Sequence, residues 1–215
     1  MTLHEYDIEK IKEKNITYLA GVDEAGRGPL AGPVCAAAVI LPKDFYVEEI
    51  NDSKKLTEKK REKLYDVIIE NAISYSIAFA DVDYIEKNNI LQATFYAMKT
   101  AVEGLDITPD YVLIDGNRTQ GITLPTECVI SGDAKSQSIA AASILAKVTR
   151  DRYCLEVLDK KYPEYCFFKH KGYGTKLHTE KILEFGPCPE HRMSFLTKIL
   201  GGKKWFLTAE KKAKN

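Results

Sequence analysis

Residues 17–41 read TYLAGVDEAGRGPLAGPVCAAAVIL, two apolar runs on either side of a loop rich in glycine and proline. The runs TYLAGVD (17–23) and PVCAAAVIL (33–41) have the length and composition of β-strands. The glycines and prolines of AGRGPLAGP are typical of a turn between strands. The segment therefore predicts a hairpin-like pair of strands, the first of which ends in two acids, Asp23 and Glu24.

Helices and strands alternate along the rest of the chain. Thr57 is placed to cap a charged helix that runs to about Asn71, with Leu64, Val67 and Ile68 on its inner face. Further strands are predicted at 73–80, at YVLID (111–115) and at ECVI (127–130), and further helices at about 89–103 and 136–162. The Ala- and Ser-rich start of the last helix would let a backbone approach a sheet closely.

The order of these elements predicts an α/β domain with a mixed sheet flanked by helices. Residues 1–162 are predicted to form this domain, and residues 163–215 a basic loop and a small C-terminal helical appendage packed on or beside it. The basic loop is FFKHKGYGTK (167–176), and GPCP separates two short helices after it. The tail from about Gly201 is expected to be loosely ordered, and Trp205 and Phe206 to pack on the protein.

The composition is that of an ordinary globular protein, with 45% hydrophobic and 29% charged residues among 215. No apolar run approaches the roughly 20 residues that span a bilayer, and the charged N-terminus lacks the apolar core of a signal peptide. We therefore expect a cytoplasmic protein with no membrane association. The five cysteines are scattered without a CxxC pair, which favours reduced thiols over a disulfide or a zinc site.

The charges are unevenly distributed along the chain. Residues 1–134 hold 14 Lys and Arg against 23 Asp and Glu, whereas residues 135–215 hold 17 against 8. An acidic half and a basic half are compatible with a carboxylate site beside a surface for a polyanion. Two solvated faces would account for the same charges.

Acids follow several of the predicted apolar strands. Asp23 and Glu24 close the first strand, Asp115 closes YVLID, and Asp133 follows ECVI and precedes the long helix. Each acid taken alone also fits a turn, a helix start or a solvated loop. Together they would repel one another unless a cation neutralised them. Oxygen ligands favour Mg²⁺ or Mn²⁺, and three or four such acids suffice for two ions in phosphodiester hydrolysis.

Seven motifs in order resemble the ribonuclease HII family. They are GVDEAGRGPLAGPV (21–34), NDSKKLT (51–57), NNILQAT (88–94), YVLIDG (111–116), SGDAKSQSIAAASILAKVTRD (131–151), KGYGT (171–175) and FGPCPEHRMSF (185–195). They cover the chain from about residue 17 to 197. The resemblance implies a ribonuclease H-like fold in residues 1–162 and a catalytic, metal-binding site of Asp23, Glu24, Asp115 and Asp133.

The resemblance also implies an activity. The family's enzymes are endoribonucleases that cut on the 5′ side of ribonucleotides in RNA/DNA hybrids and in duplex DNA with embedded ribonucleotides. They leave a 3′-hydroxyl and a 5′-phosphate and use two Mg²⁺ or Mn²⁺ ions. The family suggests a monomer, whose partners are these nucleic acids.

Five further residues are predicted to bind the substrate, and each has a structural alternative. The glycines of Gly26-Arg27-Gly28 allow close backbone approach to a ribose 2′-hydroxyl, although they also suit a tight turn. Tyr173 would stack on the nucleotide after the ribose, unless it simply packs in its loop. Lys54 resembles a phosphate-contacting lysine of the family but also fits a charged lead-in to a helix.

Three other functions remain open from the residues alone. A different metal-dependent phosphotransferase on a related fold, such as a DNA exonuclease or an integrase-like enzyme, would show no preference for ribonucleotides. A binding module without activity would bind hybrid duplexes with steep salt dependence and never cut them. An actin-like or sugar-kinase nucleotide site would need a phosphate loop, which the sequence lacks.

Overall fold

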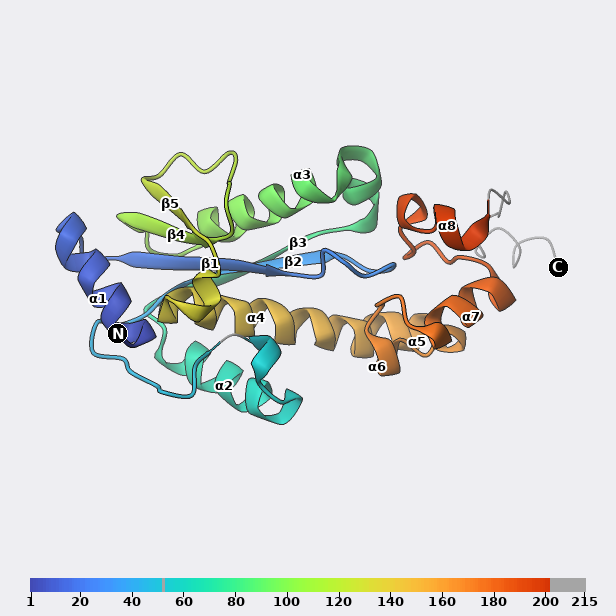
Figure 1. Cartoon of the computed structure of the whole chain (residues 1–215), viewed down its shortest axis with the longest axis horizontal. Helices are drawn as coiled ribbons and strands as arrows, with labels where there is room; N and C mark the ends of the chain where they lie inside the picture. The colour runs from blue at the N-terminus through green and yellow to red at the C-terminus, as the bar shows by residue number, and fades with distance from the viewer. Residues whose placement is uncertain (52, 202–215) are drawn as a thin grey trace. The chain divides into compact units, whose positions relative to one another are not determined.

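The computed structural model describes residues 1–51 and 53–201 (Figure 1). The predictions for Trp205, Phe206 and the Lys-rich tail fall outside these residues. The described strands are β1 (Leu19–Ala25), β2 (Val34–Ile40), β3 (Ser74–Ala80), β4 (Tyr111–Asp115) and β5 (Thr126–Val129). The α-helices are α1 (Leu3–Lys14), α2 (Glu58–Asn71), α3 (Val82–Glu103), α4 (Gln137–Tyr153), α5 (Asp159–Lys161), α6 (Phe167–His170), α7 (Lys176–Phe185) and α8 (Thr197–Leu200).

The five strands form one mixed sheet in the order β3-β2-β1-β4-β5. β1 pairs antiparallel with β2 across the Gly/Pro-rich loop, as the hairpin-like pattern predicts. β1 also pairs in parallel with β4, and β4 in parallel with β5. The parallel register aligns the ends of three strands at one edge of the sheet, and this edge carries the predicted acids.

Most elements agree with the sequence, but α1 was not predicted and α3 begins earlier than expected. The helix was expected to begin at about Asn89, but it begins at Val82 and contains Asn89 in a non-helical conformation with φ 69°. The Asn89 side chain accepts hydrogen bonds from the amides of Leu91 and Gln92, so it caps the second half of the helix. The predicted start is therefore the start of this second half.

The basic loop at 167–176 was also predicted without regular structure. Its first residues, Phe167–His170, instead form α6, and Phe167 and His170 are buried. The apolar ring of Phe167 drives this burial. The predicted long helix is continuous through α4, a π-helical segment at Cys154–Leu158, and α5.

Small side chains let α4 pack closely on the sheet. Ala140, Ala141, Ala142 and Ala146 are fully buried, in one apolar cluster with residues of β2 and α2. An added Cβ on Gly21 of β1 would collide with the backbone of Ser138 and Ile139. α4 and the second half of α3 lie on opposite sides of the sheet (Figure 1).

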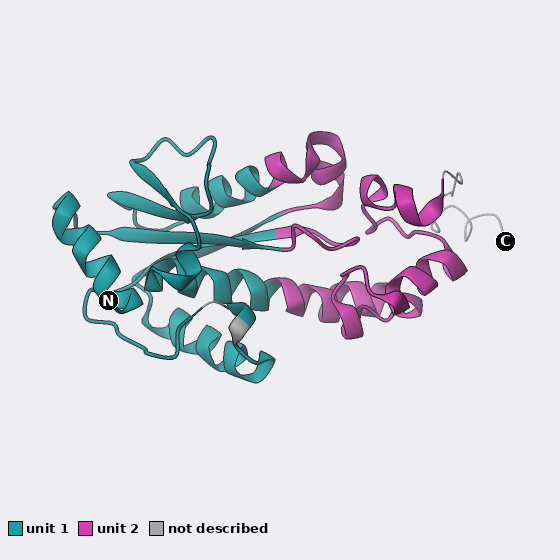
Figure 2. Cartoon of the chain, viewed as in Figure 1, with its two compact units in different colours: residues 1–25, 35–79, 94–149 teal, residues 26–34, 80–93, 150–215 magenta. Residues whose placement is uncertain are grey.

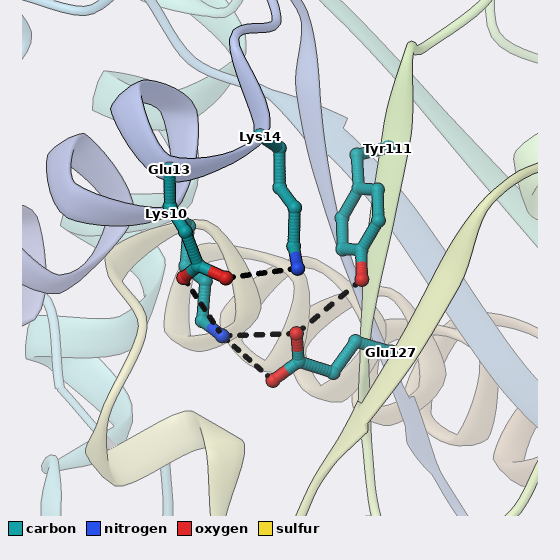
Figure 3. Close-up of polar contacts among 5 residues, drawn as sticks. All are labelled: Lys10, Glu13, Lys14, Tyr111 and Glu127. Atoms are coloured by element: carbon teal, nitrogen blue, oxygen red, sulfur yellow. Dashed lines mark hydrogen bonds and ion pairs between the residues drawn. The ribbon is translucent and has the colours of Figure 1, made fainter.

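A polar network fixes α1 against β4 and β5 of the sheet (Figure 3). The Lys10 ammonium lies 2.9 Å from both carboxylate oxygens of Glu127 on β5. The Tyr111 hydroxyl on β4 donates to the same carboxylate at 3.4 Å. Glu13 forms ion pairs with Lys10 and Lys14. A charged helix is thus held by residues whose long stems also cover apolar surface.

The chain divides into two compact units (Figure 2). Unit 1 comprises residues 1–25, 35–79 and 94–149, and unit 2 comprises residues 26–34, 80–93 and 150–215. The expected division into a domain of residues 1–162 and an appendage of residues 163–215 stays a prediction. Within the described ranges, no helix combines the length and apolarity needed to cross a membrane. All five cysteines carry free thiols.

Candidate active site

Asp23 lies near the carboxyl end of β1 in unit 1, and Asp115 is the last residue of β4, the neighbouring parallel strand. The register pairs Val22 on β1 with Ile114 on β4, so the two acids follow side by side at the carboxyl edge. Glu24 is the next residue of β1, and its amide donates to the Asp23 carboxylate at 2.7 Å. The carboxyl edge of a sheet is where α/β proteins usually bind their ligands.

Asp133 reaches the same region through the turn after β5. This turn passes through Ser131, whose φ of 54° is left-handed, into the short helix Gly132–Ala134. The amide of Gly132 donates to the Asp115 carboxylate at 2.6 Å. An added Cβ on Gly132 would lie 2.6 Å from the Ile139 side chain and 3.3 Å from the Asp115 carboxylate. A side chain here would therefore displace the end of the Ile139 side chain, and glycine leaves room for the turn that leads to Asp133.

Asp23 is buried, with an exposed fraction of 5%. Burial raises its pKa well above the ordinary value, and the negative charges of Glu24 and Asp115 raise it further. Hydrogen bonds from the Glu24 amide and the Ser143 hydroxyl act in the opposite direction. Burial first, and then the neighbouring carboxylates, thus oppose the ionisation of Asp23.

Ser143 was not singled out in the sequence. It lies in the Ala-rich part of α4, its hydroxyl contacts Asp23, and it is 2.7 Å from the Ser53 hydroxyl. Ser53 belongs to the short helix Ser53–Lys55, in which the Lys54 ammonium lies 3.8 Å from the Asp133 carboxylate. The sequence feature that could have identified Ser143 is its hydroxyl group within an alanine-rich helix. The predicted lysine thus lies beside a predicted acid in unit 1.

The donors at this edge suit a hard divalent cation in their chemistry, because all are carboxylate oxygens. A cation would also offset the repulsion that raises the pKa of Asp23. Within residues 1–51 and 53–201, no three His, Cys, Asp or Glu side chains are already grouped closely enough to hold a metal ion.

Unit 2 contains the Gly26-Arg27-Gly28 loop. Gly26 has a φ of 98°, and a Cβ there would collide with the Arg150 side chain. Arg27 and Gly28 are exposed, and the space next to Gly28 is open within 4 Å. The loop therefore has a buried start and an accessible tip, as expected of a segment that approaches a ligand through its backbone.

Tyr173 also belongs to unit 2, with 40% of its surface exposed. The Arg150 guanidinium lies 5.6 Å from its ring centroid. The Tyr173 carbonyl accepts a hydrogen bond from His178 Nδ1 at 3.0 Å, which holds the backbone of the turn in place. His170, a member of the predicted basic loop, is buried, and burial lowers its pKa. The exposed Lys169 and Lys176 keep the basic character of this surface.

A mixed sheet flanked by helices, with acids at the carboxyl ends of β1 and β4, is the architecture of ribonuclease H-like proteins. The structure of the ribonuclease H2 from Pyrococcus horikoshii OT3 is similar to this chain, with a TM-score of 0.69 and 27% identity over 85% of this chain and 97% of that one. The structure of Bst-RNase HIII in complex with Mn²⁺ shares the fold, with a TM-score of 0.64 and 17% identity over 86% of this chain and 69% of that one.

Sequence comparison defines the family. The family model described as Ribonuclease HII matches residues 20–198, and the chain belongs to this family of nucleases. The ribonuclease HII of Caldicellulosiruptor saccharolyticus is 54% identical over 192 residues, covering 89% of this chain and 93% of the relative. That of Acetivibrio thermocellus is 56% identical, over 85% of this chain and 71% of the relative. The predicted resemblance, fold class and enzyme class are confirmed.

Proposed function

We propose that this protein is an endoribonuclease that hydrolyses the phosphodiester on the 5′ side of ribonucleotides, in RNA/DNA hybrids and at ribonucleotides embedded in duplex DNA. The products are a 3′-hydroxyl and a 5′-phosphate. The observation that carries the proposal is the placement of Asp23 and Asp115 at adjacent strand ends, with the Gly132 turn leading Asp133 toward them. The family match makes nucleic acid the substrate class.

Asp23, Glu24, Asp115 and Asp133 would hold Mg²⁺ or Mn²⁺, with two ions bound during catalysis. The ions supply charge neutralisation at the scissile phosphate and lower the pKa of the attacking water. The acids orient this centre, because the amides of Glu24 and Gly132 fix the Asp23 and Asp115 carboxylates. Attack by water breaks the bond between phosphorus and O3′, and the proton lost by the water balances the one gained by O3′.

Residues outside the carboxylate group would select the substrate. The backbone of Gly26-Arg27-Gly28 would contact the 2′-hydroxyl, which distinguishes RNA from DNA. Tyr173 would stack on the neighbouring nucleotide, and Lys54 would contact a phosphate. The exposure of Arg27, Gly28, Lys54 and Tyr173 supports these roles. The monomeric state and the cytoplasmic location stay predictions.

The test is cleavage of a DNA duplex carrying one ribonucleotide, with Mg²⁺, Mn²⁺ or a chelator, beside an all-DNA duplex. We expect a metal-dependent cut on the 5′ side of the ribonucleotide and none in the control. Asp115→Asn should reduce the rate on the order of 10²-fold or more, because it removes a charge at the reacting centre.

Asp110→Asn is the matched control, because Asp110 is exposed and lies just before the opposite end of the same strand. It should cleave at the rate of the unmodified protein. Equal rates for Asp115→Asn and the unmodified protein, or equal cutting of both duplexes, would contradict the proposal.

A further inference from the structure

Arg192 lies fully buried inside the loop that carries Gly26-Arg27-Gly28. Its Nε donates to the Gly32 carbonyl at 2.9 Å, and its Nη1 to the carbonyls of Arg27 and Pro29 at 3.0 and 2.9 Å. Its Nη2 donates to the carbonyls of Gly26 and Gly32 at 2.6 and 2.7 Å. An arginine side chain has five N–H donors, and here the loop backbone takes up all of them.

The hydrogen-bond partners of the Arg192 guanidinium are backbone carbonyl groups. Burial, together with the charge of the nearby Arg150, lowers the pKa of Arg192 to about 9, which leaves the guanidinium charged at neutral pH. Hydrogen bonds to a charged donor are stronger than those between neutral groups. The loop is therefore held by charge-assisted bonds that pull four of its carbonyls toward one point.

The main chain around Arg192 reinforces this arrangement. The Arg192 amide donates to the Leu30 carbonyl at 2.8 Å, and His191 forms a β-bridge with Ala31. The Phe195 ring lies 5.3 Å from the guanidinium and restricts its position. Since the bonded carbonyls point inward to Arg192, the exposed backbone at Arg27 and Gly28 is presented in one conformation.

We propose that Arg192 is a positioning residue that sets the selectivity for ribose over deoxyribose by fixing the backbone of Gly26-Arg27-Gly28. The inference rests on the proposed function, in which this backbone contacts the 2′-hydroxyl. A 2′-hydroxyl is recognised only where a donor and an acceptor are held at the right places, and a mobile loop would lose much of that preference.

The test measures binding without cleavage, in an Asp23→Asn background with Mg²⁺ present. Fluorescence anisotropy gives the Kd of a DNA duplex with one ribonucleotide and that of the all-DNA duplex, and the ratio of the two Kd values reports ribose selectivity. Lysine has three donors in place of five, so Arg192→Lys keeps the charge but loses at least two bonds. We expect the selectivity to fall about fivefold to tenfold while the Kd of the all-DNA duplex changes less than about twofold.

Arg61→Lys is the matched control. Arg61 also donates to backbone carbonyls, those of Ser53 and Leu56 at 2.9 and 2.6 Å, but in unit 1. It should leave the selectivity unchanged. A loss of affinity for both duplexes by the same factor in Arg192→Lys would show that the residue is merely structural and would overturn the proposal.

A milder variant covers the case in which Arg192→Lys does not fold. Phe195→Leu removes the ring beside the guanidinium and retains all five donors, and it should lower the selectivity by a smaller factor. Unchanged selectivity in a folded Phe195→Leu protein would count against the proposal. Failure of the proposed function itself is separate, since the Asp23→Asn parent would then bind both duplexes equally.

Discussion

Asp23 shows how a single residue is placed at a cost to stability. Its carboxylate is buried between the charges of Glu24 and Asp115, and its raised pKa records the resulting opposition to ionisation. In the unfolded chain the same group ionises at its ordinary pKa. The raised pKa of Asp23 therefore lowers the stability of the metal-free folded protein at neutral pH, a cost that a functional site commonly carries.

We predict that Asp23→Asn stabilises the metal-free protein at pH 7.5 while it abolishes cleavage. The melting temperature in chelator should rise by a few degrees, since about 1 kcal/mol corresponds to roughly 2–4 °C in a protein of this size. The gain should fade as the pH falls toward 4, because a raised folded-state pKa of Asp23 lowers stability only as the pH rises from the unfolded pKa to the folded pKa. Calorimetry at both pH values measures this.

Asp110→Asn is the control, and its expected effect on stability is the opposite of that of Asp23→Asn. Hydrogen bonds from the amides of Tyr18 and Thr17 lower the pKa of Asp110, so its ionised form favours folding. The melting temperature of this variant at pH 7.5 should not rise.

Mg²⁺ should raise the melting temperature of the unmodified protein more than that of Asp23→Asn, because a ligand that binds only the folded state stabilises that state. A lower melting temperature for Asp23→Asn in chelator would contradict the prediction.

At the scale of elements, the contact between β1 and α4 supports the acid site. Gly21 lies against the backbone of Ser138 and Ile139, and the Ser138 amide donates to the buried Asp7 carboxylate at 2.8 Å. Burial raises the pKa of Asp7, while the bonds from Ser136 and Ser138 oppose the rise. α1, β1 and the start of α4 are therefore packed together just after Asp133.

We predict that Gly21→Ala destabilises the protein by about 3 kcal/mol, near the upper range for overpacking, because the colliding atoms are backbone and cannot rotate away. Urea unfolding monitored by circular dichroism measures the change. Ala37→Gly, on β2 in the same core, is a control that removes a methyl group without a collision. It should cost about 1 kcal/mol. If Gly21→Ala lowered the free energy of unfolding no more than this control, the close contact between β1 and α4 would not require glycine at this position.

At the scale of the whole molecule, a buried histidine chain couples stability to pH. The Cys188 amide donates to His191 Nδ1 at 2.9 Å, and the Nε2 atoms of His191 and His178 are 3.0 Å apart. His178 Nδ1 then donates to the Tyr173 carbonyl at 3.0 Å. This sequence of bonds uses one acceptor nitrogen on each ring, so both imidazoles must be neutral.

We predict that these two histidines contribute a loss of stability as the pH falls from about 6.5 toward 4. Burial, and then the neighbouring His170, lowers the pKa of His178 to about 4, and burial with His178 lowers that of His191 to about 3. The unfolded chain therefore takes up protons first, and stability is complete only above the unfolded pKa. The slope contributed by each histidine is at most about 1.4 kcal/mol per pH unit.

Urea unfolding at a series of pH values tests this coupling. His178→Asn keeps a donor near the Tyr173 carbonyl but removes a titrating group, so its stability should depend less steeply on pH between 6.5 and 4. His4→Asn, in α1, is the control for removing a histidine outside the cluster. An identical slope in His178→Asn and the unmodified protein would show that the cluster does not titrate on unfolding.

The sequence by itself determined the family, the order of most elements and the mixed sheet. Strand and helix periodicity is local, so β1, β2, β4 and α2 could be predicted from a few neighbouring residues. The four acids were singled out because each follows an apolar strand. Helix boundaries were harder to predict from the sequence. The non-helical conformation of Asn89 inside α3 depends on a side-chain cap that forms only in the folded chain.

Only the tertiary structure decided which side chains meet. Arg150, Arg192 and the buried histidines had no local signal, because their partners are not their neighbours in sequence. The five bonds of Arg192 reach residues more than 150 positions earlier in the chain. Burial and charge proximity, which set the pKa of Asp23 and of His178, arise from packing in three dimensions and leave no periodic pattern in the chain.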